Sequence, residues 1–196
     1  MSFRRISAYI IDILIITFAS SMLASISYIN PQLKKYNEVY KEYTEVNQEY
    51  LTALKERSSN NLDAIKTKLN EITYKLDRNN IVGASIHIVL TVLYFVFFQK
   101  FNHGQTLGKM LMKIKIEGNL TLFKYFLRSV ILHNILINLL KIVFILILKK
   151  ENYILASNIL YVGALLIEVT IIVMVTMRQD HRGLHDLITG SSVVKA

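Results

Sequence analysis

Long apolar runs alternate with polar segments along this chain. A helix needs about 20 mostly apolar residues to cross a hydrocarbon core roughly 30 Å thick, and runs of that length lie at residues 6–28, 81–98, 122–148 and 154–177. The third run is the least uniform, because it contains several charged and amide side chains, and its most apolar window is 129–148. The pattern predicts an all-α membrane protein with four transmembrane helices.

A polar segment of about 50 residues separates the first two runs and contains no glycine and one proline. Apolar and aromatic side chains recur in it every three or four positions, on both sides of a polar turn at 57–61. Residues 31–80 are therefore predicted to form an antiparallel, coiled-coil-like helical hairpin outside the membrane that continues the first two spans. The stripe positions are Leu33, Tyr36, Tyr40, Tyr43, Val46, Tyr50 and Leu54, followed by Leu62, Ile65, Leu69, Ile72 and Leu76.

The domain organisation follows from these segments. Residues 1–30 form a first span with a charged entry, 31–80 form the hairpin, and 81–196 hold the other three spans, with a loop at 99–121 and a tail at 178–196. The Lys and Arg counts of the two faces are similar and do not decide the orientation. Acidic residues offset the basic residues of the hairpin but not those of the loop, so we expect both termini in the cytoplasm, with the protein in the cell membrane.

Composition narrows the function classes. The chain has a net charge of +9. In a membrane protein, an excess of Lys and Arg reflects loops that face the anionic lipid bilayer, so we expect no nucleic-acid partner. The absence of cysteine excludes disulfides and thiolate metal sites. No set of nucleophile, base and orienting residue is visible, so we expect neither an enzyme nor a cofactor. The apolar run after Arg4 and Arg5 could be read as a secretory signal, but Asp12 within it favours a retained span.

Three short stretches carry polar residues in a distinctive order. The first span opens with R-R-x-x-A-x-x-I-D, the loop contains G-Q-T-L-G-K, and the tail contains R-G-L-H-D. The loop motif comprises Gly104, Gln105, Thr106, Gly108 and Lys109, and the C-terminal motif comprises Arg182, Gly183, His185 and Asp186.

Together these motifs resemble the RDD family of bacterial membrane proteins, which is named for one arginine and two aspartates. By this resemblance the named residues are Arg5, Asp12 and Asp186. The resemblance implies a multi-helix membrane domain that has been suggested to act in transport, with sodium/proton exchange proposed for some members. The hairpin departs from the compact family pattern, so the resemblance implies nothing about its role.

Charged side chains inside the predicted spans are functional candidates in their own right. Asp12 lies about 9 Å inside the membrane by helical rise, where a carboxylate is costly unless it is paired or hydrated. Arg128 enters the third span at a similar depth, so we predict an Asp12–Arg128 ion pair, with Arg5 near the headgroups. Glu168 and His133 are expected at a deeper level, where they could carry protons or a cation. A purely structural role for these charges stays open.

The loop and the tail offer further readings. The Gly104–Lys109 stretch fails the P-loop spacing, because three residues separate the glycines and Met110 follows the lysine. Alternation in 112–117 predicts a short strand that pairs with 191–195, which would bring Asp186 close to Arg4 or Arg5.

The tail also contains a pair of histidines with metal-like spacing. His181 and His185 lie four residues apart, beside Asp180 and Asp186, but no further ligands follow, and we expect no metal.

Two functions remain open at this point. The first is transport of a small solute or ion, for which Asp12, Arg128 and Glu168 should converge on one cavity. The second is a membrane scaffold in which the 31–80 hairpin binds a protein partner or a second copy of the chain, for which the tyrosine stripe should be exposed.

Overall fold

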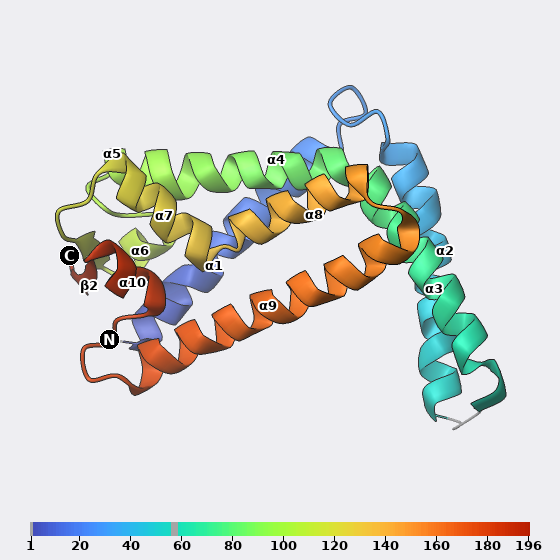
Figure 1. Cartoon of the computed structure of the whole chain (residues 1–196). Helices are drawn as coiled ribbons and strands as arrows, with labels where there is room; N and C mark the ends of the chain where they lie inside the picture. The colour runs from blue at the N-terminus through green and yellow to red at the C-terminus, as the bar shows by residue number, and fades with distance from the viewer. Residues whose placement is uncertain (1, 56–58) are drawn as a thin grey trace.

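The computed structural model describes residues 2–55 and 59–196, and most of these residues are helical (Figure 1). The elements are α1 (Ser2–Ala24), α2 (Leu33–Lys55), α3 (Ser59–Asn79), α4 (Ile81–Val92), the π-helical segment η1 (Leu93–Phe98), α5 (Gln99–Phe101), α6 (Leu107–Leu111), β1 (Ile114–Glu117), α7 (Leu122–Leu132), α8 (Ile135–Ile147), α9 (Lys150–Met177), α10 (Leu184–Thr189) and β2 (Ser192–Lys195).

Within the described residues, three helical stretches are long and apolar enough to cross a membrane: α1, the continuous stretch Ile81–Phe101, and α9. A fourth is present if α7 and α8 are counted together, although they are bent by 69°. The sequence predicts one helix over 122–148, and this prediction is wrong. The break occurs because Asn134 adopts a left-handed backbone conformation (φ 50°), which a continuing α-helix cannot contain.

Helices α2 and α3 pack against each other along the predicted apolar stripes. Their shared core contains Val46, Ala53, Ile65 and Ile72. Two stripe tyrosines, Tyr43 and Tyr50, pack partly buried against this core, whereas Tyr40 is exposed. Residues 57 and 58 of the predicted turn, including Arg57, lie outside the described residues, as does residue 56.

The α2–α3 pair does not continue the axes of α1 and α4 as predicted, but lies across the end of the bundle (Figure 1). The change of direction between α3 and α4 occurs at Asn80, and α3 contacts α8 and α9. Asp77 of α3 accepts a hydrogen bond from the Tyr153 hydroxyl at 2.7 Å and lies 3.7 Å from the Lys141 ammonium. These polar contacts with α8 and α9 hold the pair sideways.

The opposite end of the bundle carries both termini and a small layer formed by α6, α10 and the two strands (Figure 1). Strands β1 and β2 pair antiparallel, with Ile114 opposite Lys195 and Ile116 opposite Val193. This confirms the predicted pairing of 112–117 with 191–195. Ile116 also joins a buried cluster with residues of η1 and α7, so the sheet ties the C-terminal tail to the bundle.

Candidate functional site

The first buried carboxylate, Asp12, is held by the loop motif. Its side chain is fully buried on the inner face of α1. It accepts hydrogen bonds from the Tyr94 hydroxyl (2.7 Å), the Thr106 hydroxyl (2.5 Å) and the Gly108 backbone N–H (2.8 Å). The Lys109 ammonium lies 3.9 Å away. The predicted Asp12–Arg128 ion pair is therefore wrong, because the loop folds back and supplies the donors that Asp12 requires.

Steric and backbone constraints explain why glycine occupies two positions of the loop motif. A Cβ at Gly108 would overlap the Ala8 carbonyl oxygen of α1 and lie 2.9 Å from the Asp12 carboxylate. Gly104 has φ +82°, a conformation that favours glycine. Gln105 donates a hydrogen bond to the Ile114 carbonyl at 3.0 Å, which ties the loop to β1. The motif thus packs the start of α6 against α1 at the level of Asp12.

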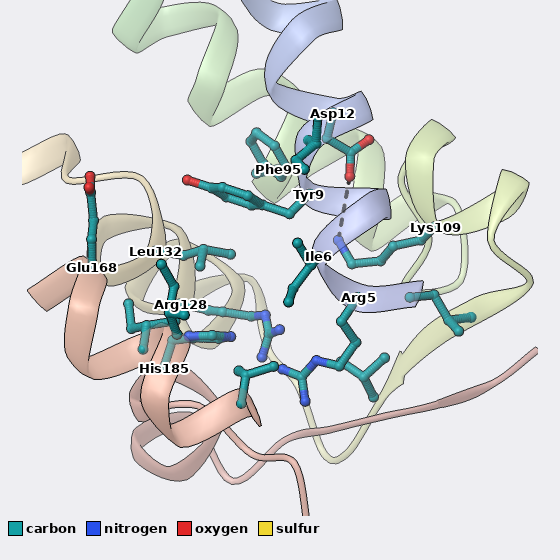
Figure 2. Close-up of a pocket in the computed structure, with 16 residues that line it drawn as sticks. Arg5, Ile6, Tyr9, Asp12, Phe95, Lys109, Arg128, Leu132, Glu168 and His185 are labelled. Carbon is teal, nitrogen blue, oxygen red and sulfur yellow. Dashed lines mark ion pairs between the residues drawn. The ribbon is translucent and has the colours of Figure 1, made fainter. Parts of the chain in front are cut away.

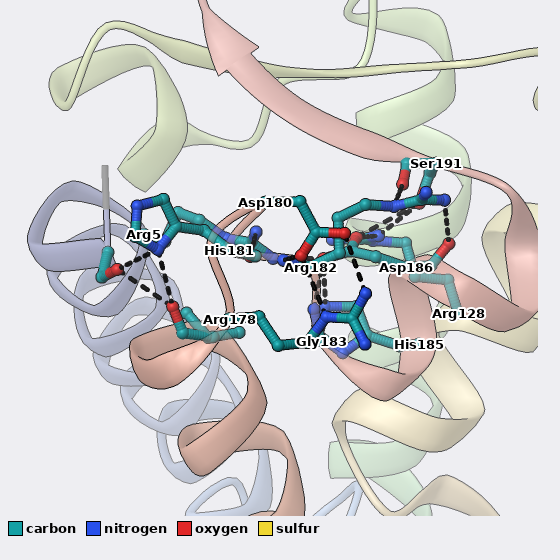
Figure 3. Close-up of polar contacts among 12 residues, drawn as sticks. Arg5, Arg128, Arg178, Asp180, His181, Arg182, Gly183, His185, Asp186 and Ser191 are labelled. Carbon is teal, nitrogen blue, oxygen red and sulfur yellow. Dashed lines mark hydrogen bonds and ion pairs between the residues drawn. The ribbon is translucent and has the colours of Figure 1, made fainter.

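The second buried carboxylate, Asp186, joins three helices (Figure 3). Arg5 of α1 and Arg128 of α7 each form a salt bridge with it, one to each carboxylate oxygen. Gly183 N–H and the Ser191 hydroxyl also donate to it, at 3.1 and 3.2 Å. The predicted proximity of Asp186 to Arg5 is confirmed.

The charge state of Asp186 follows from these neighbours. Burial alone would raise the pKa of this carboxyl, but the charges of Arg128 and Arg5 hold it below its ordinary value. Asp186 is therefore ionised at neutral pH, and it clamps α1, α7 and α10 together.

The remaining tail residues shape the segment around Asp186. Arg182 donates to the Ser191 carbonyl at 2.9 Å, and Gly183 caps the start of α10. His185 is buried with Nε2 3.5 Å from Asp186, and burial, followed by the charge of Arg128, lowers its pKa well below the ordinary value. The ring of His181 lies 2.9 Å from the Ser2 hydroxyl.

Metal binding has no geometric support in the described residues. The two tail histidines have separate partners, and the part of the chain that the structure describes holds no group of three or more candidate metal ligands.

The two carboxylate clusters are Asp12 with its partners and Asp186 with its partners. Asp12 itself and, from the second cluster, Arg5, Arg128 and His185 line one cavity of about 400 Å³, which we call the inner cavity (Figure 2). Asp12, Arg128 and Glu168 all line it, as the transport hypothesis requires. Lys109 lines it as well. Burial lowers the pKa of Lys109 to about 7, although the charge of Asp12 opposes this shift.

A second cavity of about 250 Å³, the middle cavity, adjoins the inner one, because Tyr9 and Glu168 line both. Glu168 accepts a hydrogen bond from the Asn134 amide at 2.7 Å. The His133 ring stacks on Phe95, with 3.7 Å between ring centroids. Both its nitrogens are buried without a hydrogen-bond partner among the described residues, so His133 and Glu168 share the cavity but not a hydrogen bond.

Two cavities lie beyond the middle one, toward the α2–α3 pair. One of about 170 Å³ shares Asn138 and Lys141 with the middle cavity and reaches Asp77 and Tyr153. The other, of about 540 Å³, shares His87 and Asn138 with it and reaches the end of α1. Polar side chains therefore border adjoining cavities from one end of the bundle to the other.

Two participants in this arrangement escaped sequence reasoning. Tyr94 stands in a plain apolar run, and only the π-helical turn of η1 and the folded-back loop bring its hydroxyl to Asp12. Ser191 follows the C-terminal motif and receives a 2.7 Å hydrogen bond from Arg128. A hydroxyl inside an apolar stretch, as at Tyr94, was the available signal.

Comparison with known proteins agrees with the motif geometry. The RDD family model matches residues 2–190, which is nearly the entire chain. No curated protein and no solved structure matches it. The match spans Arg5, Asp12 and Asp186, the residues that the two carboxylate clusters hold in place. With its apolar helices, the chain is a multi-pass membrane protein, and it belongs to the RDD family.

Proposed function

We propose that the chain crosses the cell membrane four times, through α1, the Ile81–Phe101 stretch, the bent α7–α8 pair and α9. The α2–α3 pair lies outside the membrane, and both termini face the cytoplasm. The two tightly bonded carboxylate clusters and the small sheet then lie at the cytoplasmic end, where α6 and α10 pack against the bundle.

We propose further that the chain transports a small solute or ion along the row of adjoining cavities. The observation that carries this proposal is the convergence of the intramembrane charges: Asp12, Arg128 and Glu168 line the inner cavity, and Glu168 continues into the middle one. Charged groups within membrane spans are expensive and mark ion or solute pathways. The proposal involves no catalytic reaction and no cofactor.

The carboxylates along this path have different roles. Asp12 accepts three hydrogen bonds and Asp186 has two guanidinium partners, so both stabilise the bundle. Glu168 accepts a single hydrogen bond among the described residues, from Asn134. Glu168 is therefore the group free to exchange a proton or a cation between the two cavities, as proton-coupled sodium movement would require.

The test is flux in proteoliposomes containing the purified full chain. A pH gradient is imposed and sodium movement is followed for the wild type, Glu168→Gln and the control Glu151→Gln. Glu151 is an exposed acid at the start of α9 that lines none of the cavities described above. We expect Glu168→Gln to lose most of the flux and Glu151→Gln to retain it. Unchanged flux in a folded Glu168→Gln protein would contradict the assignment.

We propose as the second function a membrane scaffold, which one observation favours. On α2, Tyr40, Leu51 and Leu54 are each 46–49% exposed, and a partner or second copy could cover these apolar side chains. If Leu51→Ser with Leu54→Ser lowers the oligomeric mass in detergent and leaves sodium flux intact, the scaffold function is supported. An unchanged mass, with a monomeric wild type, counts against self-association.

A further inference from the structure

The inner cavity opens sideways between two membrane helices. Ile6 and Ile10 of α1 and Ile172 of α9 line the cavity and are also 38%, 52% and 56% exposed. Ile10 lies eight residues beyond the start of α1, and Ile172 lies five residues before the end of α9. At a rise of 1.5 Å per residue these positions are roughly 8–12 Å from the helix ends. The opening therefore lies near the boundary between lipid headgroups and acyl chains.

The closed end of the same cavity is basic (Figure 2). Arg5, Lys109 and Arg128 line it and are each at most 9% exposed. The buried carboxylates beside them are Asp12 and Asp186, so three cations face two anions when Lys109 is protonated. The third carboxylate that lines the cavity, Glu168 of α9, accepts a hydrogen bond from Asn134 and forms no ion pair with these cations within the described residues. The basic cluster itself therefore carries one excess positive charge.

Donors also remain unused at the basic end. Within the described residues, every hydrogen bond of the Arg128 side chain starts at Nη1, although a guanidinium has donors on Nε and Nη2 as well. Lys109 Nζ donates to the Thr106 hydroxyl at 3.2 Å and has two further protons. Donors of buried side chains that line a cavity favour an acceptor there, and a charged acceptor most of all.

The walls between the basic end and the opening are mostly apolar. Leu132 of α7 and Ile171 and Val175 of α9 line the cavity together with the exposed isoleucines, and Glu168 is the one carboxylate in this part of the described lining. An acyl chain would bury its surface against these walls, which stabilises binding by about 25 cal/mol per Å².

We propose that the inner cavity binds an anionic amphiphile of the membrane, with its acid group at Arg128 and Lys109 and its acyl chain between Ile10 and Ile172. A phospholipid phosphate and a fatty-acid carboxylate supply the same chemistry. The site rests on the inner cavity alone and does not depend on solute movement. An occupant would close the inner end of the proposed path, so binding is measured in detergent, where no flux occurs.

The experiment uses the purified full chain in a neutral detergent. Phosphatidylglycerol, oleate, phosphatidylcholine and inorganic phosphate are added separately, and bound adducts and melting temperature are recorded by native mass spectrometry and thermal unfolding. We expect retention and stabilisation with phosphatidylglycerol or oleate, and which of the two binds more tightly identifies the source of the acid group. Equal retention of phosphatidylcholine, or equal stabilisation by inorganic phosphate, would overturn the proposal.

Variants separate the two ends of the site. Lys109→Met removes one charged donor and should weaken binding of the anionic amphiphile about tenfold, as the loss of a charge-assisted hydrogen bond implies. Ile10→Trp fills the opening, and Leu14→Trp places the same bulk one turn further along α1, on an exposed residue that does not line the cavity. Binding should fall in Ile10→Trp and persist in Leu14→Trp. Equal binding by these two variants would refute the location.

Discussion

Replacing Asp186 with asparagine tests the clamp at the end of the bundle that carries both termini. The carboxylate is fully buried and accepts from Arg5, Arg128, Gly183 N–H and Ser191. Asparagine preserves the shape but leaves two buried guanidinium charges without a counter-charge. Removing one partner of a buried ion pair costs about 3–5 kcal/mol. At about 2–4 °C per kcal/mol for a chain of this size, the melting temperature should fall by roughly 6–20 °C.

The assay is thermal unfolding of the purified chain in detergent, followed by circular dichroism. The control is Asp180→Asn, an identical exchange in the same tail. Asp180 pairs with Arg178 at 2.9 Å, but both side chains are more than 40% exposed, so no measurable change is expected. A fall below about 2 °C for Asp186→Asn, less than 1 kcal/mol by the same conversion, would refute the clamp.

Acid provides an independent check on the same carboxylate. The folded-state pKa of Asp186 is below its ordinary value, so its stabilisation is complete above about pH 4 and is lost as the pH falls through the folded-state pKa. The wild type should therefore lose more stability in acid than Asp186→Asn. Parallel pH profiles for the two proteins would mean that the arginines do not stabilise the ionised form.

Three further predictions concern other contacts. Gly108→Ala should destabilise the chain by about 1–3 kcal/mol, because its Cβ would overlap α1, whereas Gly163→Ala, with no atom within 4 Å of its Cβ, should be neutral or stabilising in the same melting assay. The pKa of Lys109 is about 7 in the folded chain, so the unfolded chain binds more protons between about pH 7 and 10. Wild-type stability should rise across this range, and Lys109→Met should flatten the rise in a pH series of melts. Tyr153→Phe removes the 2.7 Å hydrogen bond to Asp77 and should lower the free energy of unfolding by about 1 kcal/mol. Amide hydrogen exchange in α3 should increase. Unchanged exchange would contradict a role of this hydrogen bond in holding α3 against α9.

Local patterns predicted much of the fold because they report local physics. Apolar runs of spanning length predicted helices that include α1 and α9, and alternation in 112–117 predicted the strand that pairs with the tail. The sideways turn of the α2–α3 pair had no such signal. The turn occurs at Asn80, whose side chain packs over Gly83, and it depends on the distant contact between Asp77 and Tyr153.

The sequence predicted most of the residues of the site, but it did not predict correctly which of them contact one another. Matching depth along two helices suggested Asp12 with Arg128, but depth alone does not say which side chain reaches inward first. Instead, the hydroxyl groups of Thr106 and Tyr94 donate hydrogen bonds to Asp12, and Thr106 is 94 residues away from Asp12 in sequence. Arg128 forms its salt bridge with Asp186. The bend at Asn134 was equally hidden, because an asparagine within an apolar run is more often an interhelical hydrogen-bonding residue than a helix break.

Water access along the row of cavities is the most direct test of the central claim. The chain contains no cysteine, so single cysteines can be introduced at Ile137, which lines the middle cavity, and at Leu139, which is exposed on the outer face of α8. A charged thiol reagent is applied to proteoliposomes, where the reactive thiolate forms only in water. We expect rapid labelling of Ile137→Cys and slow labelling of Leu139→Cys. Equally slow labelling at both positions would contradict a hydrated path through the bundle.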